Sequence, residues 1–219
     1  MGSSPAVSRE TSAAKAPKRG PYAKSSETRE RILTAALEVA GDVGFHRASV
    51  ARIARRAGVA VGNLHYHFGT REELLLQLMA WLVDQLIAEM REASRSAGGT
   101  LASEEARFRA YLEHVHRNPA YIRLGEEVRL HHPELYAQSN RRWLAGFREL
   151  IRRGVAQGEL RPMNEDEIAA QAHFLMGARY FLDQMIAGVD GRPYPGDAAV
   201  VAAYMNLVRG GLMRPVTGA

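Results

Sequence analysis

The sequence predicts an all-α fold, in which a small N-terminal domain with a helix-turn-helix precedes a larger helical domain. Apolar residues recur at helical spacing along most of the chain, and no strand pattern appears after residue 103. A glycine, Gly58, separates two short helical patterns and allows the sharp turn of a helix-turn-helix. The chain has 219 residues, of which 46% are hydrophobic, so it is long enough to form both domains with ample core.

Residues 1–24 are expected to form a disordered basic arm, because they are rich in Ser, Ala, Pro and Gly and lack apolar periodicity. Lys18, Arg19 and Lys24 stand just before the first expected helix. Basic arms in that position can follow DNA into the minor groove. A solubilising tail that makes no DNA contact is an equally good interpretation, and the sequence leaves both open.

Residues 25–71 are expected to form three helices. The first begins at a cap on Ser25 or Ser26 and runs to about Val43, with an apolar stripe that packs across the other two. Ser49 can cap the second helix with its hydroxyl. The third helix is then free to enter a DNA major groove.

The third helix has one apolar face, formed by Val61, Leu64 and Phe68. Its outward face is therefore polar, aromatic and small, and the residues on or beside that face are Gly62, Asn63, His65, Tyr66 and His67. Glycine allows close approach of the backbone to DNA, and asparagine can pair with an adenine edge. A metal site made by the two histidines fails on geometry, because residues two apart on a helix point about 200° apart.

The segment GVAVGNLHYHFGTREELL, which begins at Gly58, resembles the signature of the tetracycline-repressor (TetR) family of bacterial transcriptional regulators. The resemblance runs from about Ser26 to Leu82. It implies a regulator rather than an enzyme, which binds double-stranded DNA as a homodimer at a palindromic operator. The DNA-contacting residues that it implies are Ser49, Ala60, Val61, Gly62, Asn63, His65, Tyr66, His67, Thr70 and Arg71.

Two positions of the third helix depart from the family pattern. Ala60 stands where Ser usually caps the helix, which should cost about 1 kcal/mol of local stability. Val61 stands where Lys commonly reaches DNA. Because both changes remove polar groups from the helix start, the operator preference is expected to differ from that of typical members and to depend on thymine methyl contacts.

The charge of the chain is unevenly placed. Residues 1–71 hold 12 Lys and Arg against 5 Asp and Glu, whereas residues 72–219 hold 17 against 19. The net charge of +5 therefore comes from the helix-turn-helix end alone. Such a positive field suits DNA binding, since neutralised phosphates release condensed counterions. A solvated basic surface is the plainer interpretation, which the adjoining motif disfavours.

Residues 72–219 are expected to form the larger domain, which by resemblance binds a ligand and forms the dimer. Helical patterns are expected at about 71–95, 104–118, 119–130, 133–157, 165–187 and 197–211. Asn164 and Glu167 form a capping box before the fifth of these helices. By resemblance the last two helices form a four-helix bundle with a second subunit, and ordinary intrachain core is the alternative use of the same apolar residues.

The resemblance also implies a small-molecule effector in an apolar cavity of the larger domain. An acyl chain or an aromatic compound would suit it, and the sequence does not choose between them. The residues expected to line the cavity or to anchor a polar group are His114, Tyr121, Arg123, Trp143, Phe147, Phe174, Arg179 and Tyr180. Bound ligand is expected to favour a dimer whose recognition helices no longer match successive major grooves, so that DNA is released.

Composition excludes several other classes of protein. The chain has no Cys, which excludes disulfides and cysteine-ligated metals. It lacks an apolar run of about 18 residues and the apolar core of a signal peptide, so a cytoplasmic protein is expected, without membrane contact. No phosphate loop or nucleophile elbow is present, and no cofactor or metal is expected. Two alternatives stay open: a DNA-binding regulator without an effector and, more remotely, a metal enzyme built in a helical bundle.

Overall fold

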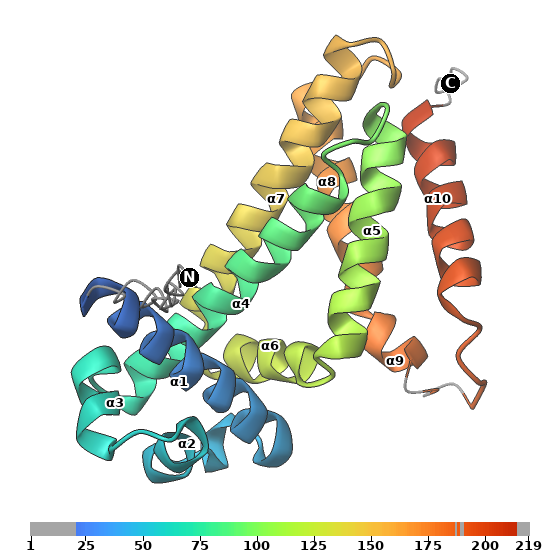
Figure 1. Ribbon diagram of the computed structural model, residues 1–219. Helices are drawn as coiled ribbons and strands as arrows, with labels where there is room; N and C mark the ends of the chain where they lie inside the picture. The colour runs from blue at the N-terminus through green and yellow to red at the C-terminus, as the bar shows by residue number, and fades with distance from the viewer. Residues whose placement is uncertain (1–20, 187, 189–190, 214–219) are drawn as a thin grey trace, which may run out of the picture.

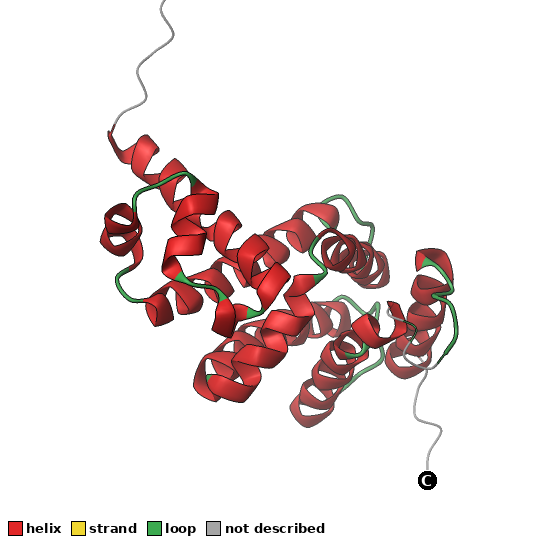
Figure 2. Cartoon of the chain, turned by 90° about the horizontal axis from the view of Figure 1, so that it is seen from below, coloured by secondary structure: helices red, strands yellow, loops and turns green. Residues whose placement is uncertain are grey.

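The computed structural model describes residues 21–186, 188 and 191–213, and these residues form helices and loops without a strand (Figure 1, Figure 2). The expected all-α fold is confirmed, with the first helices of the chain gathered at one end of the molecule and the later helices forming the rest (Figure 1). Within this described part, none of the helices combines the length and the apolar character needed to cross a membrane. Lys18 and Arg19 of the expected basic arm lie outside the described residues.

Three α-helices and a short 3₁₀ turn form the N-terminal end: α1 Pro21–Val43, η1 Phe45–Arg47, α2 Val50–Ala57 and α3 Val61–Phe68. The predicted start of α1 is wrong, because the helix begins at Pro21 rather than at a cap on Ser25 or Ser26. Proline suits the first turn of a helix, since its fixed φ matches the helix and its missing N–H would have no partner there. Lys24 is therefore helical rather than part of a disordered arm.

The turn between α2 and α3 has the geometry of a helix-turn-helix. Gly58 has a φ of 66°, in the left-handed region that favours glycine, and its N–H donates to the carbonyls of Ala54 and Arg55. Arg31 of α1 donates to the carbonyl of Ala57 at 2.8 Å. The turn is thus held both by its own backbone and by the first helix.

Seven further helices occur among the described residues: α4 Arg71–Ala93, α5 Thr100–Arg117, α6 Ala120–His131, α7 Pro133–Ala156, α8 Glu165–Tyr180, α9 Leu182–Ile186 and α10 Asp197–Met213. The long helices α4, α5, α7, α8 and α10 pack along one another, while α6 lies across one end of them and against α1 (Figure 1). α8 starts with the predicted capping box, in which Asn164 and Glu167 each accept a hydrogen bond from the other's backbone N–H.

Two of these helices differ from the expected bounds. α5 begins at Thr100 rather than near residue 104, because the Glu159 carboxylate accepts a hydrogen bond from the Thr100 N–H at 2.5 Å. This distant side chain caps a helix end that has no local side-chain cap. The long helix expected near the C-terminus is interrupted at Phe181, whose φ of −102° and ψ of 11° end α8 before α9 begins.

The buried apolar side chains form two cores. The N-terminal core joins α1, α2 and α3 to the first part of α4, as far as Leu82, and includes Leu124 and Val128 of α6. The C-terminal core joins α5, α7, α8 and α10 to the far part of α4, which contributes Leu86 and Met90. The core that begins in the first three helices therefore continues past residue 71, and α4 belongs to both cores.

Candidate functional site

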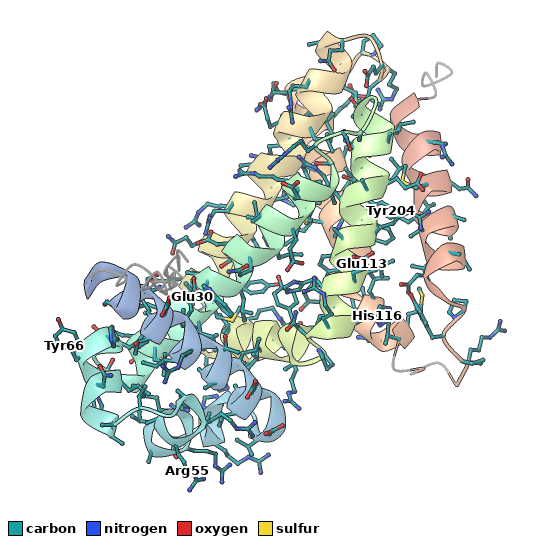
Figure 3. The ribbon with its side chains drawn as sticks, in the orientation of Figure 1. Glu30, Arg55, Tyr66, Glu113, His116 and Tyr204 are labelled. Carbon is teal, nitrogen blue, oxygen red and sulfur yellow. The ribbon has the colours of Figure 1, made fainter. Side chains whose placement is uncertain are left out.

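The outward face of α3 is exposed, as the sequence predicts. Leu64 and Phe68 are buried in the N-terminal core, whereas Gly62 and Asn63 are exposed and Tyr66 is 84% exposed. Figure 3 shows the Tyr66 side chain pointing away from the body of the protein. α3 therefore presents a polar and aromatic surface to solvent and an apolar surface to the core.

The helix starts next to this face are capped differently. The hydroxyl of Ser49 accepts a hydrogen bond from the Arg52 N–H at 3.3 Å, as expected, and that of Thr70 accepts from the Glu73 N–H at 3.1 Å. The Glu73 carboxylate accepts in return from the Thr70 N–H at 2.7 Å, and these bonds hold the pKa of Glu73 below its usual value. Ala60 makes no side-chain cap, so the first turn of α3 can donate its N–H groups to a phosphate oxygen instead.

Arg71, which was expected to meet a DNA phosphate, also supports the fold. Its side chain is half-buried, and Nε donates to the carbonyl of Ala48 at 3.1 Å, which fastens the start of α4 to the segment before α2. Tyr66 differs, because its ring is exposed and makes an edge contact with the ring of His67, with 5.3 Å between centroids. Tyr66 is therefore the position at which DNA contact can be tested separately from folding.

The two histidines of α3 point to different neighbours. His65 Nδ1 lies 2.7 Å from the carbonyl oxygen of Gly69, while His67 packs against Tyr66 and Phe68. Among the described residues, no group of three or more His, Asp or Glu side chains is arranged to hold a metal ion.

The sequence reasoning missed the exposed arginines of α2. Arg52 and Arg55 are exposed, and Figure 3 shows Arg55 pointing away from the protein. Arg56 instead pairs with Glu38 at 3.0 Å and with Asp42 at 3.3 Å, both on α1. The available signal was the helical period, because Arg52 and Arg55 fall outside the buried stripe of α2.

An apolar cavity lies in the larger helical part, between α4, α5, α6, α7 and α8, and has a volume of about 110 Å³. Four of the eight expected ligand residues line it: Tyr121, Trp143, Arg179 and Tyr180. The other lining residues are Met79, Val83, Tyr111, Ile122, Gly125, Glu126, Val128, Tyr136, Ser139, Asn140 and Met176. A mostly aromatic and aliphatic wall with a few polar groups suits a largely apolar ligand.

Two expected anchors lie outside this cavity, because they bond within the protein. His114 is buried, and its Nδ1 lies 3.1 Å from a Glu89 carboxylate oxygen. Arg123 donates to the carbonyl of Ala40 at 3.1 Å and to that of Gly41, so it joins α6 to the end of α1. Neither expectation of a ligand anchor is supported.

Two expected aromatic residues also lie outside the cavity. Phe147 is buried in the C-terminal core beside Trp143, with 6.2 Å between the ring centroids. Phe174 is 70% exposed on α8. Residue type alone did not distinguish a cavity wall from core or surface, because that depends on the rotation of each helix in the folded protein.

Arg179 lines the cavity, but its charge is already paired with Glu104 in a buried ion pair. Its guanidinium donates to Glu104 at 2.5 Å, to the Tyr204 hydroxyl at 2.7 Å and to the Leu175 carbonyl at 2.6 Å. Burial alone would lower the pKa of Arg179, but Glu104 and Tyr204 raise it, so the group stays charged. A charge that is already paired in this way is a poor anchor for a further anion.

Three cavity residues of α7 that were not expected, Tyr136, Ser139 and Asn140, follow a pattern that the sequence contains. Together with the expected Trp143 they recur at intervals of three and four, so all four share one face of the helix. A stripe that mixes hydroxyl, amide and aromatic groups differs from an ordinary core stripe. This stripe in the sequence could have indicated that this face of α7 lines a cavity.

The sequence matches a known family over its N-terminal part. The profile of the "Bacterial regulatory proteins, tetR family" matches residues 32–78. The chain is 33% identical over 152 residues to the HTH-type transcriptional regulator SrpR of Pseudomonas putida, covering 66% of this chain and 68% of SrpR. It is 32% identical over 122 residues to the HTH-type transcriptional activator FasR of Mycolicibacterium smegmatis, covering 55% of this chain and 56% of FasR. The chain belongs to the TetR family.

Solved structures of TetR-family proteins share the fold. A TetR-family structure from a Rhodococcus species has a TM-score of 0.73 at 18% identity, covering 85% of this chain and 99% of the other. FadR of Bacillus subtilis, in complex with stearoyl-CoA, has a TM-score of 0.70 at 20% identity, covering 83% of this chain and 98% of FadR. TetR-family members are transcriptional regulators rather than enzymes; they bind DNA as dimers, and some of them bind small-molecule effectors.

Proposed function

We propose that this TetR-family regulator is a homodimeric repressor that leaves a palindromic operator when a mostly apolar small molecule binds. The position of the apolar cavity carries the proposal. Its wall includes Met79 and Val83 of α4 and Ile122 and Gly125 of α6, and both helices also contribute side chains to the N-terminal core. A ligand that moved either helix would therefore move the DNA-binding end directly.

DNA would be read by the exposed face of α3 in the major groove, where Asn63 and Tyr66 can reach base edges, sugars and thymine methyls. Ser49, Thr70 and Arg71 stand at helix starts beside that face and would meet phosphates. The positive charge of the N-terminal third supports this assignment. A protein that acts on bacterial DNA works in the cytoplasm, which is therefore the location that we propose.

Exposed apolar side chains support a dimer through the C-terminal helices. Phe174 of α8 is 70% exposed, Phe181 before α9 is 60% exposed, and Leu207 of α10 is 74% exposed. Packing against the same helices of a second copy would stabilise the dimer by about 25 cal/mol for each Å² of apolar surface buried. A two-fold dimer would present α3 twice, to major grooves about 34–36 Å apart.

The lining of the cavity supports an apolar effector, either an acyl chain or an aromatic compound. The similarity of fold to FadR, whose structure contains stearoyl-CoA, supports the acyl choice. A coupling of about 1–3 kcal/mol between the two sites would change operator affinity about 5–150-fold, which is enough for regulation.

The DNA-binding part of the proposal is tested with Tyr66→Ala on an operator selected from random-sequence duplexes. We expect a loss of about tenfold or more in affinity, measured by electrophoretic mobility shift, because Tyr66 is exposed on the reading face. The matched control is Leu130→Ala, which removes a side chain that is 74% exposed on α6. Equal operator affinity in the wild type and in Tyr66→Ala would contradict the assignment of α3.

The dimer and the effector are tested by native mass spectrometry. Phe174→Glu combined with Leu207→Glu should give monomers, while the wild type gives dimers that carry a small mass released on denaturation. That compound should in turn release the operator. A wild-type dimer that binds the operator and responds to no bound compound would support a regulator without an effector.

A further inference from the structure

A second hollow, whose lining combines charged residues with apolar and small ones, lies between α4 and α7 beside Arg107 of α5 (Figure 1). We call it the α4–α7 groove; its volume is about 660 Å³, much larger than that of the apolar cavity. Its charged lining consists of Arg91, Arg107, Arg142 and Arg153 against Asp84 and Glu149. Four guanidinium groups face two carboxylates, so the groove carries an excess of positive charge.

The carboxylates of the groove neutralise only two of these arginines. Arg142 pairs with Asp84, and Arg153 lies 3.5 Å from Glu149 on the preceding turn of α7. Arg107 Nε donates to the hydroxyl of Ser94 at 3.2 Å, and within the described part of the chain it forms no ion pair with a carboxylate of the groove. The two carboxylates of the groove therefore leave Arg91 and Arg107 without a carboxylate partner in the groove, among the residues that the structure describes.

The guanidinium groups are close enough to act on one another. Partial burial lowers the pKa of Arg107, and the charges of Arg153, Arg179 and Arg91 lower it further, while Glu104 opposes them. An anion placed among these groups would relieve their repulsion. Guanidinium groups bind phosphate oxygens through paired N–H donors, so several arginines in one groove favour a ligand with more than one phosphate.

The groove and the apolar cavity adjoin at one side chain. Trp143 lines both, and its ring lies beside Phe147, which lines the groove. A single molecule can therefore place an apolar part on one side of Trp143 and a charged part on the other.

We propose that the α4–α7 groove binds the phosphorylated head group of the effector, a small molecule with at least two phosphates whose apolar part occupies the adjoining cavity. The proposal rests on the ligand-responsive function proposed above, and it adds the chemical class of the head group and the residues that hold it.

A nucleic acid is a poorer occupant of the groove, because of where the groove lies. Arg91 comes twenty residues after Arg71 on α4, which places it about 30 Å from the DNA end at a rise of about 1.5 Å per residue. The groove thus lies at the far end of the helix that begins at DNA. A head group held between α4 and α7 would act on α4 at that end, while the apolar part contacts Met79 and Val83 nearer to DNA.

The proposal is tested by isothermal titration calorimetry on the full chain, with coenzyme A, decanoate and decanoyl-coenzyme A as probes. In the wild type, decanoyl-coenzyme A should bind more tightly than either of its parts. The variant Arg91→Gln with Arg153→Gln should bind decanoyl-coenzyme A about tenfold or more weakly, because charge-assisted hydrogen bonds to phosphate are lost. Its affinity for decanoate should not change.

The matched control is Arg141→Gln, which removes an exposed arginine of α7 that does not line the groove. It should bind all three probes as the wild type does. Circular dichroism and native mass spectrometry check that each variant is folded and dimeric, which is expected because Arg91 and Arg153 are exposed.

Each contrary result bears on a different claim. Equal binding of decanoyl-coenzyme A by the double variant and the wild type would overturn the groove as the head-group site, even if decanoate binds and the apolar effector stands. Binding of coenzyme A as tight as that of decanoyl-coenzyme A would overturn the link between groove and cavity. Arginine-dependent binding of coenzyme A, together with tighter binding of decanoyl-coenzyme A and operator release, would support both proposals.

Discussion

The N-terminal core buries only apolar side chains among the described residues, while α5 and α8 bury four polar ones, Thr100, Glu104, His114 and Arg179. The C-terminal core also borders the apolar cavity and holds the Arg179 guanidinium 4.7–5.8 Å from the centroids of four aromatic rings. A close-packed apolar core keeps the surface of α3 in one shape. Buried polar groups need specific partners, so the C-terminal core is the part that a change of partner can rearrange.

The largest loss in the free energy of unfolding should come from breaking the buried ion pair between Glu104 and Arg179. Glu104→Leu leaves the Arg179 charge buried beside Tyr204 without its carboxylate partner, which should lower the free energy of unfolding by about 3–5 kcal/mol. Urea unfolding at a fixed protein concentration measures this loss. The control is Glu105→Gln, whose partner is Arg109 on the surface and which should cost about 1 kcal/mol or less.

The same pair allows a sharper test of the C-terminal core. Adding Arg179→Met to Glu104→Leu removes the uncompensated charge and should recover most of the lost free energy of unfolding. If Glu104→Leu alone is as stable as Glu105→Gln, the buried pair does not matter for stability, and the contrast between the two cores is wrong.

A smaller effect is expected at the DNA-reading surface. A Cβ added at Gly62 meets nothing within 4 Å in the protein, so Gly62→Ala should raise the free energy of unfolding by up to about 1 kcal/mol. Operator affinity should nevertheless fall about tenfold, because the new methyl group would lie where the backbone of α3 approaches DNA. Urea unfolding and mobility shift on the same variant measure the two effects. Unchanged operator affinity would show that α3 does not approach DNA at Gly62.

The missing cap of α3 offers a test of local stability. Ala60→Ser should add a hydroxyl acceptor at the helix start and raise the free energy of unfolding by about 1 kcal/mol, measured by urea unfolding. Ala80→Ser places the same hydroxyl at an exposed position in the middle of α4 and should give no gain. A gain of the same size in both variants would contradict a capping effect.

The smallest change in stability should come from the protonation of His114 as the pH falls. Burial lowers its pKa from 6.5, although the nearby Glu89 carboxylate opposes this shift. Below pH 6.5 the unfolded chain therefore takes up a proton at His114 more readily than the folded protein does. The contribution of neutral His114 to the free energy of unfolding is complete above pH 6.5 and is lost as the pH falls below it. His114→Gln should reduce the loss of stability between pH 7.5 and pH 5.5, measured as the urea midpoint. An unchanged loss in this variant would assign the acid sensitivity to other groups.

The N-terminal end could be predicted from the sequence because its signals are local. Ser49 and Thr70 cap helices that begin at the next residue, and Gly58 turns the chain between its two neighbours. The C-terminal part is different, since the start of α5 depends on a hydrogen bond between Thr100 and Glu159, 59 residues apart.

The cavity was predictable only in part, for a related reason. Tyr121 and Trp143 are aromatic residues that face the cavity, and their type pointed to it correctly. Arg123 and His114 carry equally suitable polar groups, but they bond to the end of α1 and to Glu89. Spacing along the chain does not show which distant partner satisfies a charged side chain, because that partner is chosen by the packing of whole helices.

The presence of α6 in the N-terminal core sets a rule for building hybrid regulators. Leu124 and Val128 fill the same core as the DNA-reading helices, and Arg123 bonds to the last turn of α1. A graft that joins residues 21–71 to a foreign sensing domain would leave this apolar surface without its cover. A working hybrid must carry α4 as far as Leu82 and must present a matching α6 face, so the natural unit of exchange is larger than the helix-turn-helix.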